Sequence, residues 1–185
     1  AFKALGVNLY SSINISAKNL SDPAFYNRTV KILDAFDIDK SYINFEITES
    51  SLMKNPELSK KIINDFNALG INFSIDDFGK GHSSLTYLSQ FKIAAIKIDR
   101  YFTSHIQTDR TIQIIVDATI NLAKNLGYSI TCEGIEDQSS ADLMTSLGCD
   151  YAQGYHYCKP IFQDDVISWY LKNEKDRKGA SKIAS

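Results

Sequence analysis

The sequence predicts an α/β fold built from repeated strand–helix units. Short segments rich in Ile, Val, Tyr and Phe alternate with longer segments in which apolar residues recur every three or four positions. This alternation is typical of a parallel sheet whose strands are joined by right-handed helical crossovers. The predicted strands span residues 9–16, 42–48, 71–76, 94–98, 128–133 and 150–154.

Turn and capping residues mark the helices between these strands. Pro near the first helical position and Gly just past the last are common helix boundaries, and both occur here. The four helix signals are Asp22-Pro23, Asn55-Pro56 up to Gly70, the apolar stripe of residues 112–123 up to Gly127, and Asp137 or Ser139 up to Gly148.

Two ways of arranging such a sheet compete, an open doubly wound sheet and a (β/α)8 TIM-type barrel. No glycine-rich phosphate loop follows the first predicted strand, which argues against the nucleotide-binding open sheet. A barrel has eight units and about 250 residues, whereas this chain has 185 residues and about six βα units. We therefore predict a TIM-type barrel that is incomplete here, with residues 1–171 in the domain and residues 172–185 as a charged tail.

Composition excludes several classes of protein. Hydrophobic residues make up 44% and charged residues 23%, which is typical of a globular domain. The net charge of -2 argues against a nucleic-acid polymer as partner, because such binding usually needs a basic surface. No apolar run is long enough to span a membrane. Cys132, Cys149 and Cys158 lack metal-site spacing, and we expect them to be buried, reduced thiols of a cytoplasmic protein.

Polar residues occur at the end of every predicted strand. The carboxyl ends of the strands in a parallel barrel face one rim, which carries the active site. A single polar residue there is often a helix cap, but a polar group at all these ends is difficult to explain by capping alone. The residues are Asn14, Glu46, Asp76 with Asp77, Lys97, Glu133 and Gln153. They predict a functional site on this rim.

The residue types indicate metal chemistry. Carboxylates and an amide carbonyl are hard oxygen donors, which suit Mg²⁺, Mn²⁺ or Ca²⁺. The adjacent pair Asp76-Asp77 would let one carboxylate bridge two ions, an arrangement used for in-line phosphoryl displacement. Lys97 could orient the attacking water, help to deprotonate it, or offset phosphate charge. Taken alone, the two aspartates could instead cap a helix that starts near Ser83.

Other catalytic patterns find little support. His82, His105 and His156 do not cluster, and no Gly-x-Ser-x-Gly nucleophile elbow occurs. The glycine-hinged segment Phe78-Gly79-Lys80-Gly81-His82 follows the two aspartates directly. It could be a mobile gate over the site or a simple strand-to-helix turn.

These segments together resemble a known family. In chain order they read INISAKNL, FEITES, IDDFGKGHSSL, IKIDR, CEGIE and GCDYAQGYHYCKP. The order and spacing of these segments, from about Leu5 to Pro160, resemble those of EAL-type cyclic-di-GMP phosphodiesterases. The resemblance implies a modified (β/α)8 barrel with a reversed strand. It also implies a hydrolase that cleaves one phosphodiester bond of cyclic di-GMP to give linear pGpG, with two Mg²⁺ or Mn²⁺ ions as cofactors.

The resemblance further implies which residues hold the ions. Asn14, Glu46 and Asp76 match ligands of the first ion. Asp76, Asp77 and Glu133 match ligands of the second ion, so that Asp76 is shared.

The same resemblance gives roles to four more residues. Lys97 matches a lysine that contacts the catalytic water, and Gln153 matches a polar residue beside the metal-bound waters. Glu49 matches a glutamate that anchors the loop after the aspartates, and Glu136 is expected to support the rim.

Two departures from the family pattern bear on activity. The family loop usually has a small residue and a tyrosine where this chain has Lys80 and His82, so we expect altered gating. The Glu-Ala-Leu motif, whose glutamate is a metal ligand, does not occur in these 185 residues and is expected upstream of Ala1, near an arginine that grips phosphate. We therefore expect an active enzyme in the intact parent protein, and weak or no activity from this chain alone.

The resemblance also implies a setting for the domain. It suggests cyclic di-GMP as ligand, a homodimer, and an upstream sensory or diguanylate-cyclase-like region in a bacterial parent whose membrane anchoring is left open. The domain itself would be cytoplasmic. Two alternative functions are kept: a non-catalytic receptor or protein-interaction module of the same fold, and a barrel lyase of the enolase kind. Receptors of this type usually lose metal ligands, whereas those that can be checked in this chain are present.

Overall fold

The computed structural model describes residues 9–36, 38–80 and 88–180. The chain divides into two compact units, one of residues 10–157 and one that includes the segment from Cys158 onward. The second unit contains the helix α9 (Gln163–Ala180), whose first turn carries Asp164 and Asp165. The predicted site residues belong to residues 10–157, and the sheet and the site described below are those of this unit.

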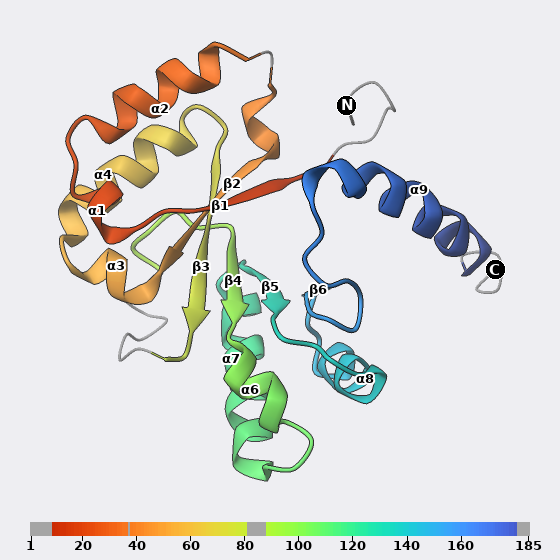
Figure 1. The fold of residues 1–185 in the computed structure, drawn as a ribbon. Helices are drawn as coiled ribbons and strands as arrows, with labels where there is room; N and C mark the ends of the chain where they lie inside the picture. Colours follow the sequence, from red (N-terminus) through yellow and green to blue (C-terminus); the bar gives the residue numbers. More distant parts are fainter. Residues whose placement is uncertain (1–8, 37, 81–87, 181–185) are drawn as a thin grey trace. The chain divides into compact units, whose positions relative to one another are not determined.

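The sheet has six strands in chain order, and each pairs in parallel with the next (Figure 1). This confirms the prediction of an incomplete TIM-type barrel with alternating strands and helices. Most strands are shorter than predicted, whereas β3 continues beyond the predicted end. The strands are β1 (Ser11–Asn14), β2 (Ile43–Thr48), β3 (Asn72–Phe78), β4 (Ala95–Ile98), β5 (Ser129–Cys132) and β6 (Tyr151–Ala152).

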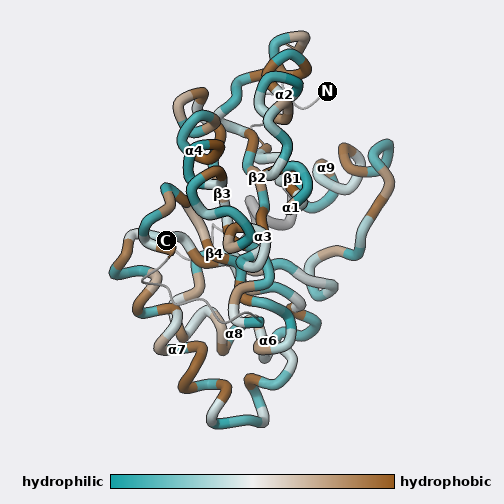
Figure 2. The backbone as a smooth tube through the Cα atoms, turned by 90° about the vertical axis from the view of Figure 1, so that its left-hand side faces the viewer, coloured by the Kyte–Doolittle hydropathy of each residue, from teal (hydrophilic) through white to brown (hydrophobic). Residues whose placement is uncertain are grey.

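The four predicted helices are present, and short helical turns occur beside them. The helices of this unit are α1 (Ala17–Leu20), α2 (Phe25–Asp34), η2 (Lys40–Tyr42), α3 (Glu49–Met53), α4 (Pro56–Asn67), α6 (Arg100–His105), α7 (Arg110–Asn125) and α8 (Gln138–Ser146). Hydrophilic and hydrophobic stretches alternate along α2 and α4 in Figure 2, as expected for helices with one face toward a core.

Local hydrogen bonds explain where two of these helices begin. The side-chain oxygen of Asn55 accepts from the backbone N–H of Leu58, and Pro56 occupies the first helical position of α4. Asp137, and not Ser139, caps α8, because its carboxylate accepts a 2.7 Å hydrogen bond from the backbone N–H of Ser140. This hydrogen bond, together with those from the side chains of Ser139, Ser140 and Gln107, lowers the pKa of Asp137 to about 2.

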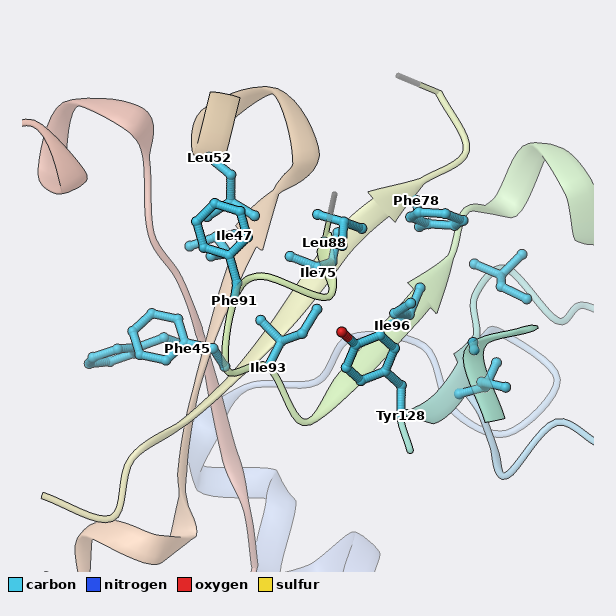
Figure 3. Packing of buried hydrophobic residues seen from close by; sticks show 14 of the residues in the cluster. Phe45, Ile47, Leu52, Ile75, Phe78, Leu88, Phe91, Ile93, Ile96 and Tyr128 are labelled. Atoms are coloured by element: carbon cyan, nitrogen blue, oxygen red, sulfur yellow. The ribbon is translucent and has the colours of Figure 1, made fainter. Parts of the chain in front are cut away.

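Apart from a bulge in β3, the central strands alternate between an apolar face and a polar face. On the apolar face Phe45, Ile47 and Ile75 are at most 2% exposed, and they pack with neighbouring strand and helix residues in Figure 3. Phe66 of α4 stacks edge-on against Phe45, with ring centroids 5.2 Å apart. Burial of this face by the helices is the main stabilising force of the fold.

The opposite face of the sheet is polar. It lines a cavity of about 330 Å³, whose walls include Asn44, Glu46, Ser74, Lys97 and Gln153. Because successive side chains of a strand point to opposite faces, the apolar residues between these positions lie on the helix-covered side. The same alternation that forms the core therefore brings the predicted site residues together.

The cysteines differ from the prediction. Cys132 and Cys149 form a disulfide with their Cα atoms 6.6 Å apart, whereas Cys158 is free and partly exposed. The expectation of reduced thiols is therefore wrong for the first two residues. Cys132 ends β5 and Cys149 follows α8 just before β6, and the pairing of β5 with β6 brings the two residues together.

We predict that reduction of this disulfide lowers the free energy of unfolding by about 3 kcal/mol, because a cross-link over 17 residues restricts the unfolded chain. Urea denaturation with and without dithiothreitol measures the difference, and Cys149→Ser should reproduce it. Cys158→Ser is the matched control and should leave the midpoint unchanged. Equal stability of the oxidised and reduced chains would contradict the prediction.

Candidate metal centre

A bulge in β3 determines the direction in which the side chains of the adjacent Asp76 and Asp77 point. Ile75 pairs with Ile96 and Phe78 pairs with Ile98, so β3 has one more residue than β4 between these pairs. Asp77 lies in this interval with φ of 54°, a left-handed conformation that is uncommon for residues other than glycine. In a regular strand Asp76 and Asp77 would point to opposite faces. The bulge allows both carboxylates to face the site.

The ammonium of Lys97 lies at the centre of three carboxylates. Its Nζ is 2.8 Å from Glu46 Oε2, 2.7 Å from Glu133 Oε1 and 3.2 Å from Asp76 Oδ1. Lys97 is 6% exposed and Glu46 is 8% exposed, so their interaction is largely shielded from water. Three residues that the sequence assigns to metal ligation therefore converge on one point.

Burial and the neighbouring opposite charges shift the pKa values of Lys97 and Glu133 in opposite directions. Burial lowers the pKa of Lys97, but its hydrogen bonds to Glu133 and Glu46 outweigh this effect and raise the pKa above its usual value. Burial raises the pKa of Glu133, with smaller contributions from Asp76 and Glu46, while Lys97 opposes the rise. The network thus keeps Lys97 as an ammonium ion, which suits orientation or charge compensation better than proton abstraction.

A second acidic cluster adjoins the first through Glu133. Carboxylate oxygens of Asp77, Asp99 and Glu133 all lie within 4.8 Å of one another. Lys80 Nζ lies 2.8 Å from Asp77 Oδ1 and 2.7 Å from Asp99 Oδ2. These four residues lie together in the wall of a cavity of about 290 Å³.

Asp99 is a site residue that the sequence analysis missed. It is 2% exposed, and it follows Lys97 by two positions, so the strand alternation that places Lys97 on the polar face also places Asp99 there. Asp99 also begins α6, where it accepts a 2.8 Å hydrogen bond from the backbone N–H of Tyr101. The alternation was a usable signal, but the residue also fits the simpler role of helix cap.

Helix α6 also positions Glu133. The Thr103 hydroxyl donates a hydrogen bond to the backbone carbonyl of Glu133, and the Glu133 N–H donates to the carbonyl of Ile98 at 3.0 Å. Gly134 follows with φ of 68°, and a side chain there would collide with Arg100. These constraints fix the backbone on both sides of the carboxylate.

The other predicted ligand and the rim glutamine also border this region. Asn14 lies opposite Glu46 in the register of β1 and β2, and the Ile15 N–H donates to the Glu46 carbonyl at 2.8 Å. Gln153 is placed by its own N–H, which donates to the Cys132 carbonyl at 2.8 Å. Both side chains are exposed, and Gln153 lines the same cavity as Glu133.

The remaining predicted residues lie around the two clusters. Glu49 is 3% exposed in the first turn of α3, and Glu136 is exposed on the wall of the 290 Å³ cavity. Phe78 is buried and Gly79 packs so closely on Phe102 that a side chain would not fit. Gly81, His82 and the helix expected near Ser83 lie outside the described residues.

The clusters have the chemistry of a site for hard divalent cations. Carboxylate oxygens predominate among the donors, and Mg²⁺ and Mn²⁺ prefer such ligands. The buried Oδ1 of Asp76 makes no hydrogen bond among the described residues and has only its ion pair with Lys97. A buried carboxylate oxygen with spare acceptor capacity is what a metal ion would use. The residues therefore fit the metal ions that the sequence predicts.

Comparisons with known proteins were made on sequence and on structure. The sequence model of the EAL domain matches residues 2–160. The cyclic di-GMP phosphodiesterase PA2567 of Pseudomonas aeruginosa is 33% identical over 168 residues, which are 91% of this chain and 29% of that protein. The chain thus spans less than a third of this relative.

Solved structures agree with the sequence comparison. The EAL domain of Mycobacterium smegmatis DcpA is similar with a TM-score of 0.86 and 30% identity, over 92% of this chain and 77% of that one. The PaMucR phosphodiesterase, solved as a c-di-GMP complex, has a TM-score of 0.81 and 30% identity, over 85% of this chain and 64% of that one.

We predict that Lys97→Met destabilises the fold by about 3–5 kcal/mol, because removing one partner of a buried ion network leaves uncompensated charge. Chemical denaturation in the presence of a chelator measures the loss, and Mn²⁺ should recover part of it by replacing the lost positive charge. Lys60→Met, at an exposed position of α4, is the control. A loss no larger than that of the control would show that the network does not stabilise the fold.

Proposed function

The chain belongs to the EAL domain family, and we propose on this basis that it provides the active site of a phosphodiesterase that hydrolyses cyclic di-GMP to linear pGpG. The observation that carries the proposal is the convergence of carboxylates on the polar rim. Glu46, Asp76 and Glu133 surround Lys97, and Asp77, Asp99 and Glu133 lie within 4.8 Å of one another. Such a set can bind cations and, through them, a phosphodiester.

Two divalent ions, Mg²⁺ or Mn²⁺, are the proposed cofactors. Asn14, Glu46 and Asp76 would hold the first ion, and Asp76, Asp77 and Glu133 the second. Asp99 adds a carboxylate beside this second set. When bound, a pair of ions supplies polarisation of the phosphoryl oxygens and a bound water of lowered pKa.

The chain's own groups would position the reactants. Lys97 holds Glu46, Asp76 and Glu133 in place, and its ammonium offsets the negative charge that gathers on the rim when a phosphodiester binds. Gln153, exposed beside Glu133, offers an amide that can hydrogen-bond a water or a phosphate oxygen. Glu49 and Glu136 would support the loop after the aspartates and the rim.

The main alternative is a receptor that binds cyclic di-GMP, or a protein partner, without hydrolysis. The presence of Asn14, Glu46, Asp76, Asp77 and Glu133 favours the enzyme, because a non-catalytic receptor does not need these metal ligands. The alternative predicts ligand binding without formation of pGpG, so one assay separates the two.

The proposal includes a setting for the domain. We place it in the bacterial cytoplasm as part of a homodimer, joined in the parent protein to a sensory or diguanylate-cyclase-like region. The relative PA2567 is more than three times as long as the matched segment, which is consistent with additional regions in such proteins. Among the described residues, no helix is both long and apolar enough to cross a membrane.

Hydrolysis is tested by following pGpG formation from cyclic di-GMP with Mg²⁺ or Mn²⁺. We expect little turnover from the 185 residues alone and clear turnover when the chain is extended at its N-terminus by a segment with the Glu-Ala-Leu motif, since that glutamate completes the first ion's ligands. In the extended protein, Asp76→Asn should reduce kcat about a hundredfold or more.

Asp117→Asn, an exposed aspartate of α7, is the matched control and should retain activity. Binding of cyclic di-GMP by the extended protein with no pGpG at any metal concentration would favour the receptor. Equal kcat for Asp76→Asn and the control would remove Asp76 from the proposed metal site.

A further inference from the structure

The ammonium of Lys80 lies against the second acidic cluster, which consists of Asp77, Asp99 and Glu133. It sits in the turn after β3, and its backbone N–H donates to the Asp77 carbonyl at 3.3 Å. This turn directs the side chain back over the strand end, where Nζ contacts Asp77 Oδ1 at 2.8 Å and Asp99 Oδ2 at 2.7 Å. Two of the three carboxylates of the cluster are thus paired with one ammonium.

The two lysines near the cluster compensate the charge of its three carboxylates. Glu133, the third member of the cluster, is paired with Lys97 at 2.7 Å. The hydrogen bonds to Asp77 and Asp99 raise the pKa of Lys80, while Lys80 helps to lower the pKa of Asp99 against the effect of burial. Each of the three carboxylates therefore already has a positive partner supplied by the chain.

From this geometry we propose that Lys80 is an internal competitor of the divalent ion at the Asp77–Asp99–Glu133 cluster and sets the affinity of that position. The inference rests on the metal site of the proposed function. A divalent ion that uses Asp77 and Asp99 would compete with the ammonium, because both cations draw on the same two carboxylate groups. The side chain of Lys80 is 54% exposed, so it can move into solvent without disturbing the core.

A purely structural role for Lys80 makes a different prediction. If the two ion pairs served only to hold the turn, their loss would lower stability and leave the metal affinity unchanged. Ion pairs of exposed lysines contribute little to stability, and Asp99 keeps its hydrogen bond from the Tyr101 N–H, so Lys80 variants should fold. A measurement of metal affinity therefore distinguishes a Lys80 that competes with the metal ion from a Lys80 that only stabilises the turn.

The experiment measures Mn²⁺ binding to the full chain, after treatment with a chelator, by the electron paramagnetic resonance signal of free Mn²⁺. Lys80→Gln removes the charge and keeps much of the side-chain length, and Lys80→Arg keeps the charge. We expect Lys80→Gln to bind Mn²⁺ about tenfold more tightly than the unaltered chain. Lys80→Arg and the exposed control Lys60→Gln should bind as the unaltered chain does.

A second variant locates the effect. Asp99→Asn introduced together with Lys80→Gln should abolish the gain in affinity, because it removes the most deeply buried carboxylate of the cluster. Equal or weaker Mn²⁺ binding by Lys80→Gln, or a gain that survives Asp99→Asn, would overturn the inference.

Mn²⁺ binding is measured independently of catalysis. The experiment can therefore contradict the competitor role of Lys80 without contradicting the proposed hydrolysis, and the reverse. An unchanged Mn²⁺ affinity in Lys80→Gln, with pGpG formed by the extended protein, would overturn the competitor role alone. A tighter Mn²⁺ site that depends on Asp99, with no pGpG formed under any condition, would support the competitor role and overturn the proposed hydrolysis.

Discussion

The arrangement of the site depends on one buried ammonium. Without Lys97, Glu46, Asp76 and Glu133 would repel one another across a poorly hydrated rim, and at least one of them would have to become protonated or move apart. Lys97 allows carboxylates from β2, from β3 and from the residue after β5 to meet at the same point.

Two features of the backbone make this arrangement possible. Strict alternation along the strands sends Phe45, Ile47 and Ile75 to the helices and Glu46 to the polar face. The bulge at Asp77 then interrupts the alternation at the one position where two consecutive carboxylates are needed on the same side. The left-handed conformation of Asp77 is a local cost, and the packed strands on either side hold it in place.

The strands, the helices and most residues of the site could be predicted from the sequence. The disulfide and the role of Asp99 could not, each for a different reason. Strands and helices follow from local periodicity and caps, which is why Asn55 and Asp137 mark helix starts correctly. The disulfide between Cys132 and Cys149 depends on the pairing of β5 with β6, a contact between distant segments that spacing does not reveal. Asp99 could not be singled out from the sequence, because an aspartate that follows a strand and precedes a helix also fits the role of a helix cap.

The distribution of departures from the family pattern follows from the same physics. Glu46, Lys97 and Glu133 lie on or directly after paired strands, where a changed residue would leave buried charge without a partner. Lys80 lies beyond the end of β3 on an exposed stem, where substitution costs the fold little. A residue at that position can therefore change without loss of the carboxylate framework, yet it still reaches Asp77 and Asp99. The loop is thus the part of the site where metal affinity can vary while the strand residues stay fixed.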